Sequence, residues 1–242
     1  MLGRYLRKCM VPDVGRRNQS ERERWLEQVL RRIPSGSRIL DAGAGTQRYR
    51  KYCQHLQYVS QDFAQYDGQG NGTGLQSKEF DYGNLDIVCD ITAIPRPDAY
   101  FDAIMCVEVL EHLPEPGKAI QEFSRLLKPG GHLVITAPFC SLTHMAPYHF
   151  CTGFSRYWYE KHLEEHRFRI IEIVPNGNFF EYLAQEILRI PYIAEKYALA
   201  RPHLWEWVSI WWMLRMLYRL SRRDRESAEL LCYGYHVYAK KE

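Results

Sequence analysis

An aspartate stands just before a pair of glycines in the stretch RILDAGAGTQRYR, residues 38–50. The apolar run before Asp41 predicts a short buried strand, which would place this acid at the strand's carboxyl end. Gly43 and Gly45 allow the backbone to approach a ligand closely. We expect a helix capped by Thr46 to follow, with its free N–H groups facing a polar or anionic group.

Three kinds of ligand compete for such a turn. A P-loop ends in Gly-Lys-Ser/Thr, which GAGTQRY lacks, and this argues against a nucleoside triphosphate. A dinucleotide fingerprint has Gly or Ala at its third position, where this chain has Arg48. S-adenosylmethionine carries an ammonium group and no pyrophosphate, so Asp41 can attract the ammonium directly or through water. The turn therefore favours S-adenosylmethionine.

Two further acids end apolar runs and fit the same cofactor. Asp62 stands where a carboxylate would accept hydrogen bonds from both ribose hydroxyls, although the same feature would serve NAD. Asp90 could accept from the adenine amino group while Ile91 donates its backbone N–H to the ring and packs on the base. Each acid also suits a helix cap or a turn.

Residues suited to proton transfer follow the predicted fifth strand, in THMAPYH. A hydroxyl acceptor must lose its proton, and a histidine base or a metal ion would assist that loss. The candidates for the catalytic role are His144, Tyr148 and His149.

The stretch EVLEH, residues 108–112, follows the predicted fourth strand. Residues three and four apart share one face of a helix, so Glu108, Glu111 and His112 can converge. Two carboxylates and an imidazole suit Mg²⁺, Mn²⁺ or Zn²⁺, and His149 would complete the set unless His144 replaces it. A metal holding two vicinal hydroxyls would lower the pKa of the one to be methylated.

Short apolar runs alternate with helical periodicities and would position these residues. The runs occupy residues 38–41, 58–61, 87–89, 101–107 and 132–137. Such alternation predicts a parallel sheet wound on both faces, with ligands beyond the carboxyl ends of its strands. SERERWLEQVLRRI predicts a docking helix that opens with a capping box of Ser20 and Glu23. PGKAIQEFSRLLKPGG predicts a helix that begins at Pro116 and ends at Pro129-Gly130-Gly131.

Two segments depart from this alternation. The loop 67–83 contains five glycines, and its length and polarity are typical of a mobile lid over cofactor or acceptor. Residues 179–225 predict a long helical insertion rich in Trp and Tyr. Glu206 and Arg215 leave too short an apolar run for this insertion to cross a bilayer. It therefore either caps the sheet and pocket or lies on a membrane surface through residues 204–223.

Composition indicates an ordinary globular protein, with 46% apolar and 25% charged residues and a net charge of +3. This charge permits an anionic partner without requiring one. The seven cysteines are scattered singly, which argues against a disulfide framework or a zinc ribbon. This pattern predicts a cytoplasmic location, with or without peripheral membrane contact. The start, MLGRYLRKCMVPD, has no apolar core of a secretory signal.

Four motifs together carry a family resemblance: ILDAGAG, SQDF, VCDI and FDAIMCVEVLEHLPEPGKAIQEFSRLLKPGGHLVITAP. They resemble the class I S-adenosylmethionine-dependent methyltransferases, particularly the branch similar to ubiquinone-pathway O-methyltransferases. The resemblance implies an α/β, doubly wound, Rossmann-like sheet of seven strands whose last strand is antiparallel, here CYGYHVYAKK. It implies cofactor contacts at Asp41, Gly43, Gly45, Gln47, Asp62, Phe63, Asp90, Ile91, Val107 and Glu108.

The chain departs from that family in two places. Gln47 stands where many members have a third glycine, and the insertion before the last strand is longer than the usual connection. The Glu-x-x-Glu-His pattern with a distant histidine also resembles the metal-dependent ubiquinone-pathway enzymes and the plant small-RNA 3′-end 2′-O-methyltransferases. Many relatives carry a similar Glu-His pair without metal, where it shapes the cofactor pocket.

These observations predict a methyltransferase that acts on a hydroxyl of a small molecule, sugar or lipid-linked intermediate. An RNA ribose 2′-O-methyltransferase and a non-catalytic binding module with this fold are the alternatives, and a dehydrogenase is a more distant one. We expect one domain over residues 1–242, with an N-terminal helical segment over 1–34 and the insertion over 179–225. Neither the acceptor nor the oligomeric state follows from the sequence.

Overall fold

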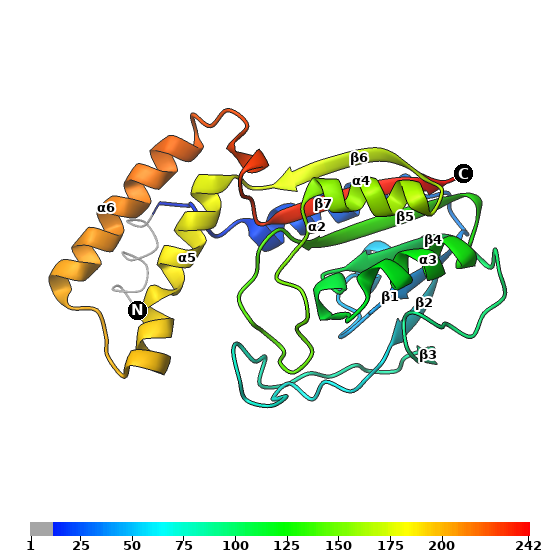
Figure 1. Ribbon diagram of the computed structural model, residues 1–242, viewed down its shortest axis with the longest axis horizontal. Coiled ribbons are helices and arrows are strands. Elements are labelled where there is room, and N and C mark those ends of the chain that lie inside the picture. Colours follow the sequence, from blue (N-terminus) through cyan, green and yellow to red (C-terminus); the bar gives the residue numbers. More distant parts are fainter. Residues whose placement is uncertain (1–11) are drawn as a thin grey trace. The chain divides into compact units, whose positions relative to one another are not determined.

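The computed structural model describes residues 12–242. The predictions for residues 1–11 lie outside the described part of the chain. They are the expectation of no secretory signal and the first part of the helical segment 1–34. The chain divides into two compact units (Figure 1). The sheet unit comprises residues 22–174 and 234–242, and the helical unit comprises residues 175–233 with those up to Glu21. The predicted single-domain organisation stays a prediction.

A seven-stranded sheet has the strand order β3-β2-β1-β4-β5-β7-β6. Its strands are β1 (Arg38–Ala42), β2 (Gln57–Asp62), β3 (Ile87–Val88), β4 (Phe101–Val107), β5 (Leu127–Pro138), β6 (Phe168–Asn176) and β7 (Gly234–Lys241). Strands β1 to β5 pair in parallel, and β7 pairs antiparallel with β5. The predicted sheet with an antiparallel last strand is confirmed. Asp41 lies level with Ser60 of β2 and Met105 of β4, so the carboxyl ends of these strands share one edge.

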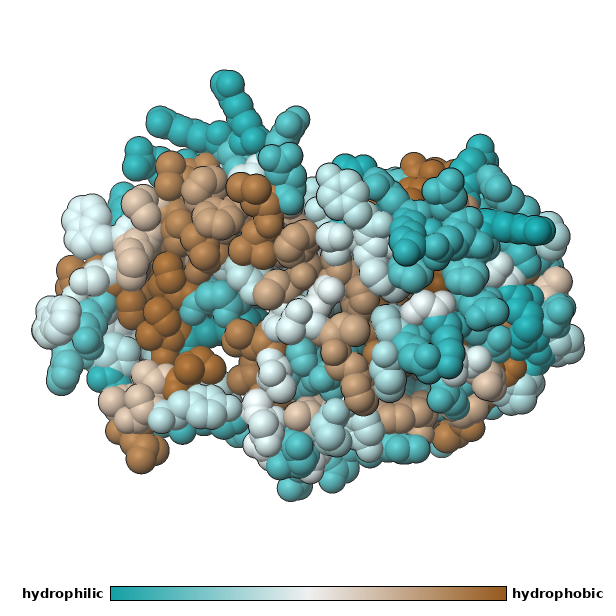
Figure 2. Space-filling model, in the orientation of Figure 1, coloured by the Kyte–Doolittle hydropathy of each residue, from teal (hydrophilic) through white to brown (hydrophobic). Residues whose placement is uncertain are grey.

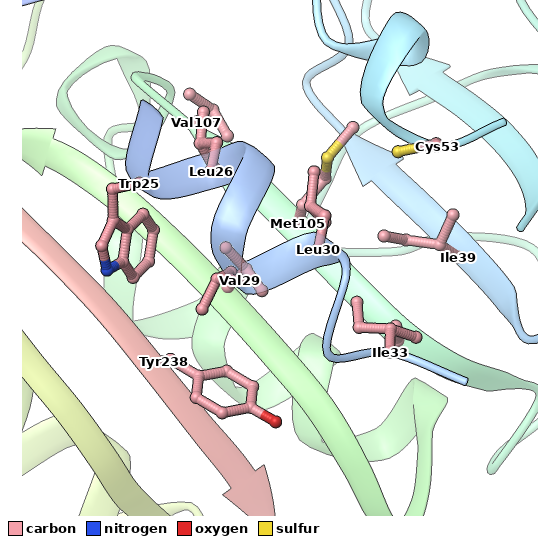
Figure 3. Close-up of a cluster of buried hydrophobic side chains, with 12 residues drawn as sticks. Trp25, Leu26, Val29, Leu30, Ile33, Ile39, Cys53, Met105, Val107 and Tyr238 are labelled. Carbon is pink, nitrogen blue, oxygen red and sulfur yellow. The ribbon is translucent and has the colours of Figure 1, made fainter. Parts of the chain in front are cut away.

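Helix α2 (Asn18–Leu30) covers one face of this sheet with the apolar side that the sequence predicts. Figure 3 shows its buried side chains directed at Ile39, Met105 and Tyr238. The predicted capping box is wrong, because the helix begins two residues earlier, at Asn18. The Ser20 hydroxyl donates to the Arg17 carbonyl at 3.1 Å.

No α-helix follows β1, contrary to the prediction of one capped by Thr46. The connection to β2 contains turns and a single 3₁₀ turn at Arg50–Tyr52. Gln47 adopts a φ of +55°, which is left-handed and incompatible with a continuing right-handed helix. N–H groups at this turn are therefore presented by loop backbone and not by a helix terminus.

The other helices of the sheet unit are α3 (Pro116–Leu126) and α4 (Arg156–Glu165). Helix α3 begins at Pro116 as predicted, but it ends at Leu126, before the Pro-Gly-Gly sequence. It buries Ile120 and Phe123.

The helical unit contains α5 (Phe179–Ile193) and α6 (Leu204–Ser221), which follow one another in the chain. The predicted long helical stretch is interrupted between them by a π-helical turn, Ala194–Ala198, and by Leu199 at a φ of +52°. Val14, Ala184, Ile210, Leu214 and Leu217 form the apolar core of this unit. Among the described residues, no helix combines the length and apolar character needed to cross a membrane.

Candidate cofactor cavity and histidine cluster

Hydrogen bonds to the end of β2 hold the turn that follows β1. The N–H groups of Gly43 and Ala44 donate to the Gln61 carbonyl at 2.9 and 2.8 Å. The Gly45 N–H donates to Asp62 Oδ2 at 2.8 Å. Gly43 has a φ of +76°, and a Cβ at this position would lie 2.5 Å from the Val109 side chain. Both the dihedral angle and the space therefore require glycine.

A cavity of 720 Å³ opens at the same edge of the sheet, a volume typical of small-ligand sites. Its lining includes most of the predicted cofactor residues: Gly43, Gly45, Asp62, Phe63, Asp90, Ile91, Val107 and Glu108. His112 and Tyr148 also line it. Five predicted site residues do not line the cavity: Asp41, Gln47, Glu111, His144 and His149.

Asp41 is buried inside β1, with 1% of its surface exposed. Its Oδ2 accepts a hydrogen bond from the Tyr58 hydroxyl at 2.5 Å. Burial raises the pKa of this carboxyl from 3.8 to about 7; the Tyr58 hydrogen bond lowers that pKa, and the nearby charge of Asp62 adds to the rise. Asp41 thus lies behind the cavity wall, and its attraction for a cofactor ammonium stays a prediction.

Asp62 faces the cavity from the end of β2. It accepts from Gly45 and Ala64 N–H groups, at 2.8 and 3.1 Å, while burial raises its pKa above the ordinary value. Asp90 also lines the cavity, and its Oδ1 accepts from both the N–H and the hydroxyl of Thr92. This is the turn geometry that the sequence offered as the alternative for Asp90, and it leaves Oδ2 available to a ligand.

Gln47 supports the cavity wall from outside. Its side-chain amide donates to the carbonyls of Tyr82 and Asn84 at 2.9 and 2.8 Å, and Tyr82 and Phe80 line the cavity. Its left-handed φ explains why glycine is common at this position in the resembling family.

The carboxylate of Glu108 is bound by residues of β5 and helix α2. It accepts from the Thr136 hydroxyl at 2.8 Å and forms an ion pair with Arg22 at 2.6 Å. The side chain of Arg22 is 13% exposed, and its Nε has no hydrogen-bond partner among the described residues. Sequence reasoning missed Arg22, because an arginine in a charged helix gives no signal that it turns inward.

Glu111, His112 and His144 converge behind the cavity, with ligand atoms within 4.8 Å of one another. His112 and His144 place Nε2 at 3.8 and 4.0 Å from Glu111 Oε1. The His112 Nδ1 lies 2.5 Å from the Tyr148 carbonyl, which orients the ring with Nε2 toward the cluster. The structure thus brings together two predicted ligands with His144, which the sequence allowed as the substitute for His149.

The cluster carries an uncompensated acid. Glu111 is 1% exposed, and its Oε2 is buried with no hydrogen-bond partner among the described residues. Burial and the charge of Glu108 raise the pKa of Glu111 well above the ordinary range. Burial and the neighbouring His144 lower the pKa of His112 to about 4. A buried acid beside two imidazoles is the arrangement that a bound cation stabilises.

The two other predicted catalytic residues lie beside this cluster. His149 Nε2 is 3.1 Å from the Ser141 hydroxyl, and its ring centre is 4.8 Å from that of His144. Tyr148 lines the cavity and packs edge-on against Phe63, at 5.0 Å between ring centres. Glu108 and His149 are outside the three-residue cluster, so the four-ligand set predicted from EVLEH is not assembled as such.

The glycine-rich loop 67–83 is joined to the loop that carries His144. Leu75 and His144 form a β-bridge, in which the Leu75 N–H donates to Thr143 and the Met145 N–H donates to Leu75, both at 2.9 Å. A Cβ at Gly74 would lie 2.5 Å from the Thr143 carbonyl oxygen. The same loop contributes Phe80 to the cavity lining, so it contacts both candidate sites.

Comparison with known proteins shows which families and folds this chain is similar to. The family described as "Methyltransferase domain" matches residues 40–135. The ubiquinone biosynthesis O-methyltransferase of Xylella fastidiosa (strain 9a5c) is 33% identical over 118 residues, 46% of each chain. The tRNA (carboxymethyluridine(34)-5-O)-methyltransferase of Arabidopsis thaliana is 33% identical over 110 residues, 44% of this chain and 25% of that protein. Residues 40–135 are thus similar to methyltransferase domains, as the sequence resemblance predicts.

Solved structures share the fold of this chain. The geranyl diphosphate C-methyltransferase of Streptomyces coelicolor A3(2) superposes with a TM-score of 0.54 at 16% identity, over 93% of this chain and 79% of that one. The 4+2 cyclase SpnF gives 0.54 at 19% identity, over 90% and 80%. Because one of these is a cyclase, the fold alone does not determine the reaction. The chain also spans about half the length of the ubiquinone-pathway relatives it matches.

Proposed function

We propose that this chain transfers the methyl group of S-adenosylmethionine to an oxygen of its acceptor. The observation that carries the proposal is the cavity at the strand ends, which has acids suited to ribose and adenine and shares His112 with the Glu111–His112–His144 cluster. Relatives named as O-methyltransferases support oxygen as the acceptor atom. A hydroxyl on a small molecule, sugar or lipid-linked intermediate is the acceptor we propose.

The cavity residues fit the cofactor. An ionised carboxylate has about four acceptor positions, and Asp62 uses two of them for backbone N–H groups, which leaves capacity for both ribose hydroxyls. Asp90 and Ile91 line the same cavity, and in this proposal Asp90 Oδ2 and the Ile91 N–H bind the adenine. When bound, the cofactor supplies a methyl group on a sulfonium, so the chain's main task is alignment of the acceptor.

The cluster fits a divalent cation, which we propose as a second component. Glu111, His112 and His144 would hold it, and Oε2 of Glu111 is a buried atom without a hydrogen-bond partner in residues 12–242. One carboxylate with two imidazoles favours zinc or another transition ion over magnesium, which prefers oxygen ligands. Such an ion would supply Lewis acidity that lowers the pKa of an acceptor hydroxyl. In this proposal His149, whose ring centre lies 4.8 Å from that of His144, receives the acceptor's proton.

Calorimetry with S-adenosylmethionine and S-adenosylhomocysteine tests cofactor binding directly. Incubation with methyl-labelled cofactor and fractionated extract then identifies the acceptor, and labelled RNA would move the assignment to ribose or base methylation. Binding without any labelled product across all fractions would instead favour a non-catalytic binding module.

The metal has its own test, which uses elemental analysis as well as turnover. Glu111→Gln should lower bound metal and activity together, whereas the exposed Glu160→Gln on α4 should change neither. Exhaustive chelation followed by separate addition of magnesium, manganese and zinc shows which ion restores turnover. Full activity of chelated, metal-free enzyme would remove the metal and leave His144 or His149 as general base.

A further inference from the structure

Helix α6 of the helical unit exposes large apolar side chains on the face opposite its core. Ile210, Leu214 and Leu217 are buried. The outward face carries Leu204, Trp205, Val208, Trp212 and Met216, which are 83%, 66%, 50%, 62% and 45% exposed. Figure 2 shows apolar residues gathered over the segment that Figure 1 labels α5 and α6. Single exposed apolar residues are ordinary, but a continuous face of this size indicates a binding surface.

The same face becomes basic toward its carboxyl end. At 100° per residue, Arg215 and Arg219 fall within the arc of the exposed apolar residues, and Arg222 and Arg223 continue it beyond the helix. None of these four arginines forms an ion pair with a described residue, whereas Arg189 and Arg201 of the same unit are paired with glutamates.

Acidic side chains are missing from this outward face. Glu206 is the acid of α6; it lies about 200° from Leu204 around the helix and accepts from the His203 N–H at 2.6 Å. The outward face thus combines exposed tryptophans and aliphatic side chains with arginines that have no ion-pair partner in the described part of the chain. We call it the α6 face, comprising Leu204, Trp205, Val208, Trp212, Arg215, Met216, Arg219, Arg222 and Arg223.

We propose that the α6 face binds the surface of an anionic lipid bilayer. Tryptophan side chains prefer the boundary between headgroups and acyl chains, and arginines on the same face attract anionic headgroups. A helix with this pairing of features lies in the plane of the interface and does not cross it. This proposal is independent of methyl transfer, since it concerns residues of the helical unit alone.

Charge complementarity favours a bilayer over the two other occupants of such a surface. In a two-fold dimer built on the α6 face, each arginine would meet a surface that offers no acid, because the facing residues are the same. A nucleic acid would satisfy the arginines, but it would leave Leu204, Val208 and Met216 without apolar partners. Anionic lipid satisfies both halves of the face.

Sedimentation of the full chain with vesicles tests the proposal. We expect binding to equimolar phosphatidylcholine and phosphatidylglycerol, much weaker binding to phosphatidylcholine alone, and a loss of affinity as salt rises. Equal binding of the unmodified protein to both vesicle compositions, or binding to neither, would overturn the proposal.

Matched variants locate the contact. R215Q with R219Q should lower the partition onto anionic vesicles about 25-fold, at about fivefold for each arginine near the surface. W205A and W212A should each lower it about tenfold, because each removes an apolar side chain from the interface. The controls are R156Q and Y157A on α4, an exposed arginine and an exposed aromatic residue of the sheet unit, which should leave the partition unchanged.

Two further measurements exclude the other occupants. Light scattering without lipid would show a dimer that the tryptophan variants dissociate, if the α6 face joins two copies. Titration with an RNA oligonucleotide would show binding that R215Q with R219Q abolishes, if the face recognises nucleic acid. Either result, obtained without vesicle binding, contradicts the proposal.

Discussion

Replacement of Asp41 by asparagine should stabilise the protein at alkaline pH relative to acidic pH. The buried carboxyl has a pKa of about 7, compared with 3.8 in an unfolded chain, so the folded state holds a proton that the unfolded state has lost. For an acid whose pKa is raised by folding, stability is full below the unfolded pKa and falls as the pH rises through the folded pKa. Asparagine removes this titration and keeps an oxygen that can accept from Tyr58.

The difference between the two pKa values sets the magnitude. At about 1.4 kcal/mol for each pKa unit, the difference of about 3 units corresponds to about 4 kcal/mol in all, of which the natural protein loses about 3 kcal/mol between pH 4.5 and pH 8. Urea denaturation of both proteins at pH 4.5 and pH 8 measures this loss, and the comparison cancels every group that they share. The buried amide adds a constant offset, so only the change with pH is informative.

Tyr58→Phe is the matched control for that experiment. Removal of the hydroxyl that donates to Asp41 should move the pH dependence to higher pH, because this hydrogen bond lowers the carboxyl's pKa. The reasoning would be refuted if the asparagine variant and the natural protein differed by the same amount at both pH values. Such a result would mean that Asp41 is hydrated and titrates normally.

Three other outcomes follow from the site. Asp62→Ala should weaken S-adenosylmethionine binding by about 1.5–3 kcal/mol in calorimetry, through loss of charge-assisted hydrogen bonds to the ribose; unchanged affinity would remove it from the site. Gly74→Ala should lower metal content and turnover, whereas Gly72→Ala should not. Both glycines have a left-handed φ, but only a Cβ at position 74 would collide with backbone. Arg22→Met should lower the free energy of unfolding by about 2 kcal/mol, measured by urea denaturation. This loss is smaller than that for a fully buried ion pair, because Glu108 can be hydrated from the cavity. An unchanged free energy would mean that the Arg22–Glu108 ion pair is not formed in solution.

The sequence predicts the sheet and the edge at which ligands would bind. Strand positions follow from the apolar runs. Parallel pairing aligns the carboxyl ends of these strands, which brings Asp62 and Asp90 to one cavity, whereas Asp41 lies inside β1. Gly43 and Gly45 are recognisable because no other residue type fits such a turn closely. These features are local, so one chain read in order contains enough information for them.

The metal-ligand set was only partly predictable, because it depends on backbone detail. The prediction assumed a helix over residues 108–112, which would align Glu108 with Glu111 and His112. Glu108 instead has a φ of +56° and precedes a 3₁₀ turn at Leu110–His112, so its side chain leaves in another direction. His144 is brought to the cluster by a bridge to Leu75, a contact across 69 residues that no spacing rule reveals.

Helix α2 lies outside the residues that match the methyltransferase family, yet it completes the core beneath them. Burial of its four apolar side chains, Trp25, Leu26, Val29 and Leu30, contributes about 1.5–3 kcal/mol apiece, which is lost when the helix is removed. The total, roughly 6–12 kcal/mol, is comparable to the whole stability of a typical domain. A fragment trimmed to residues 40–135 would retain the cofactor turn and the acids and still fail to fold. The part of the chain that matches the family is therefore shorter than the part that is needed for folding.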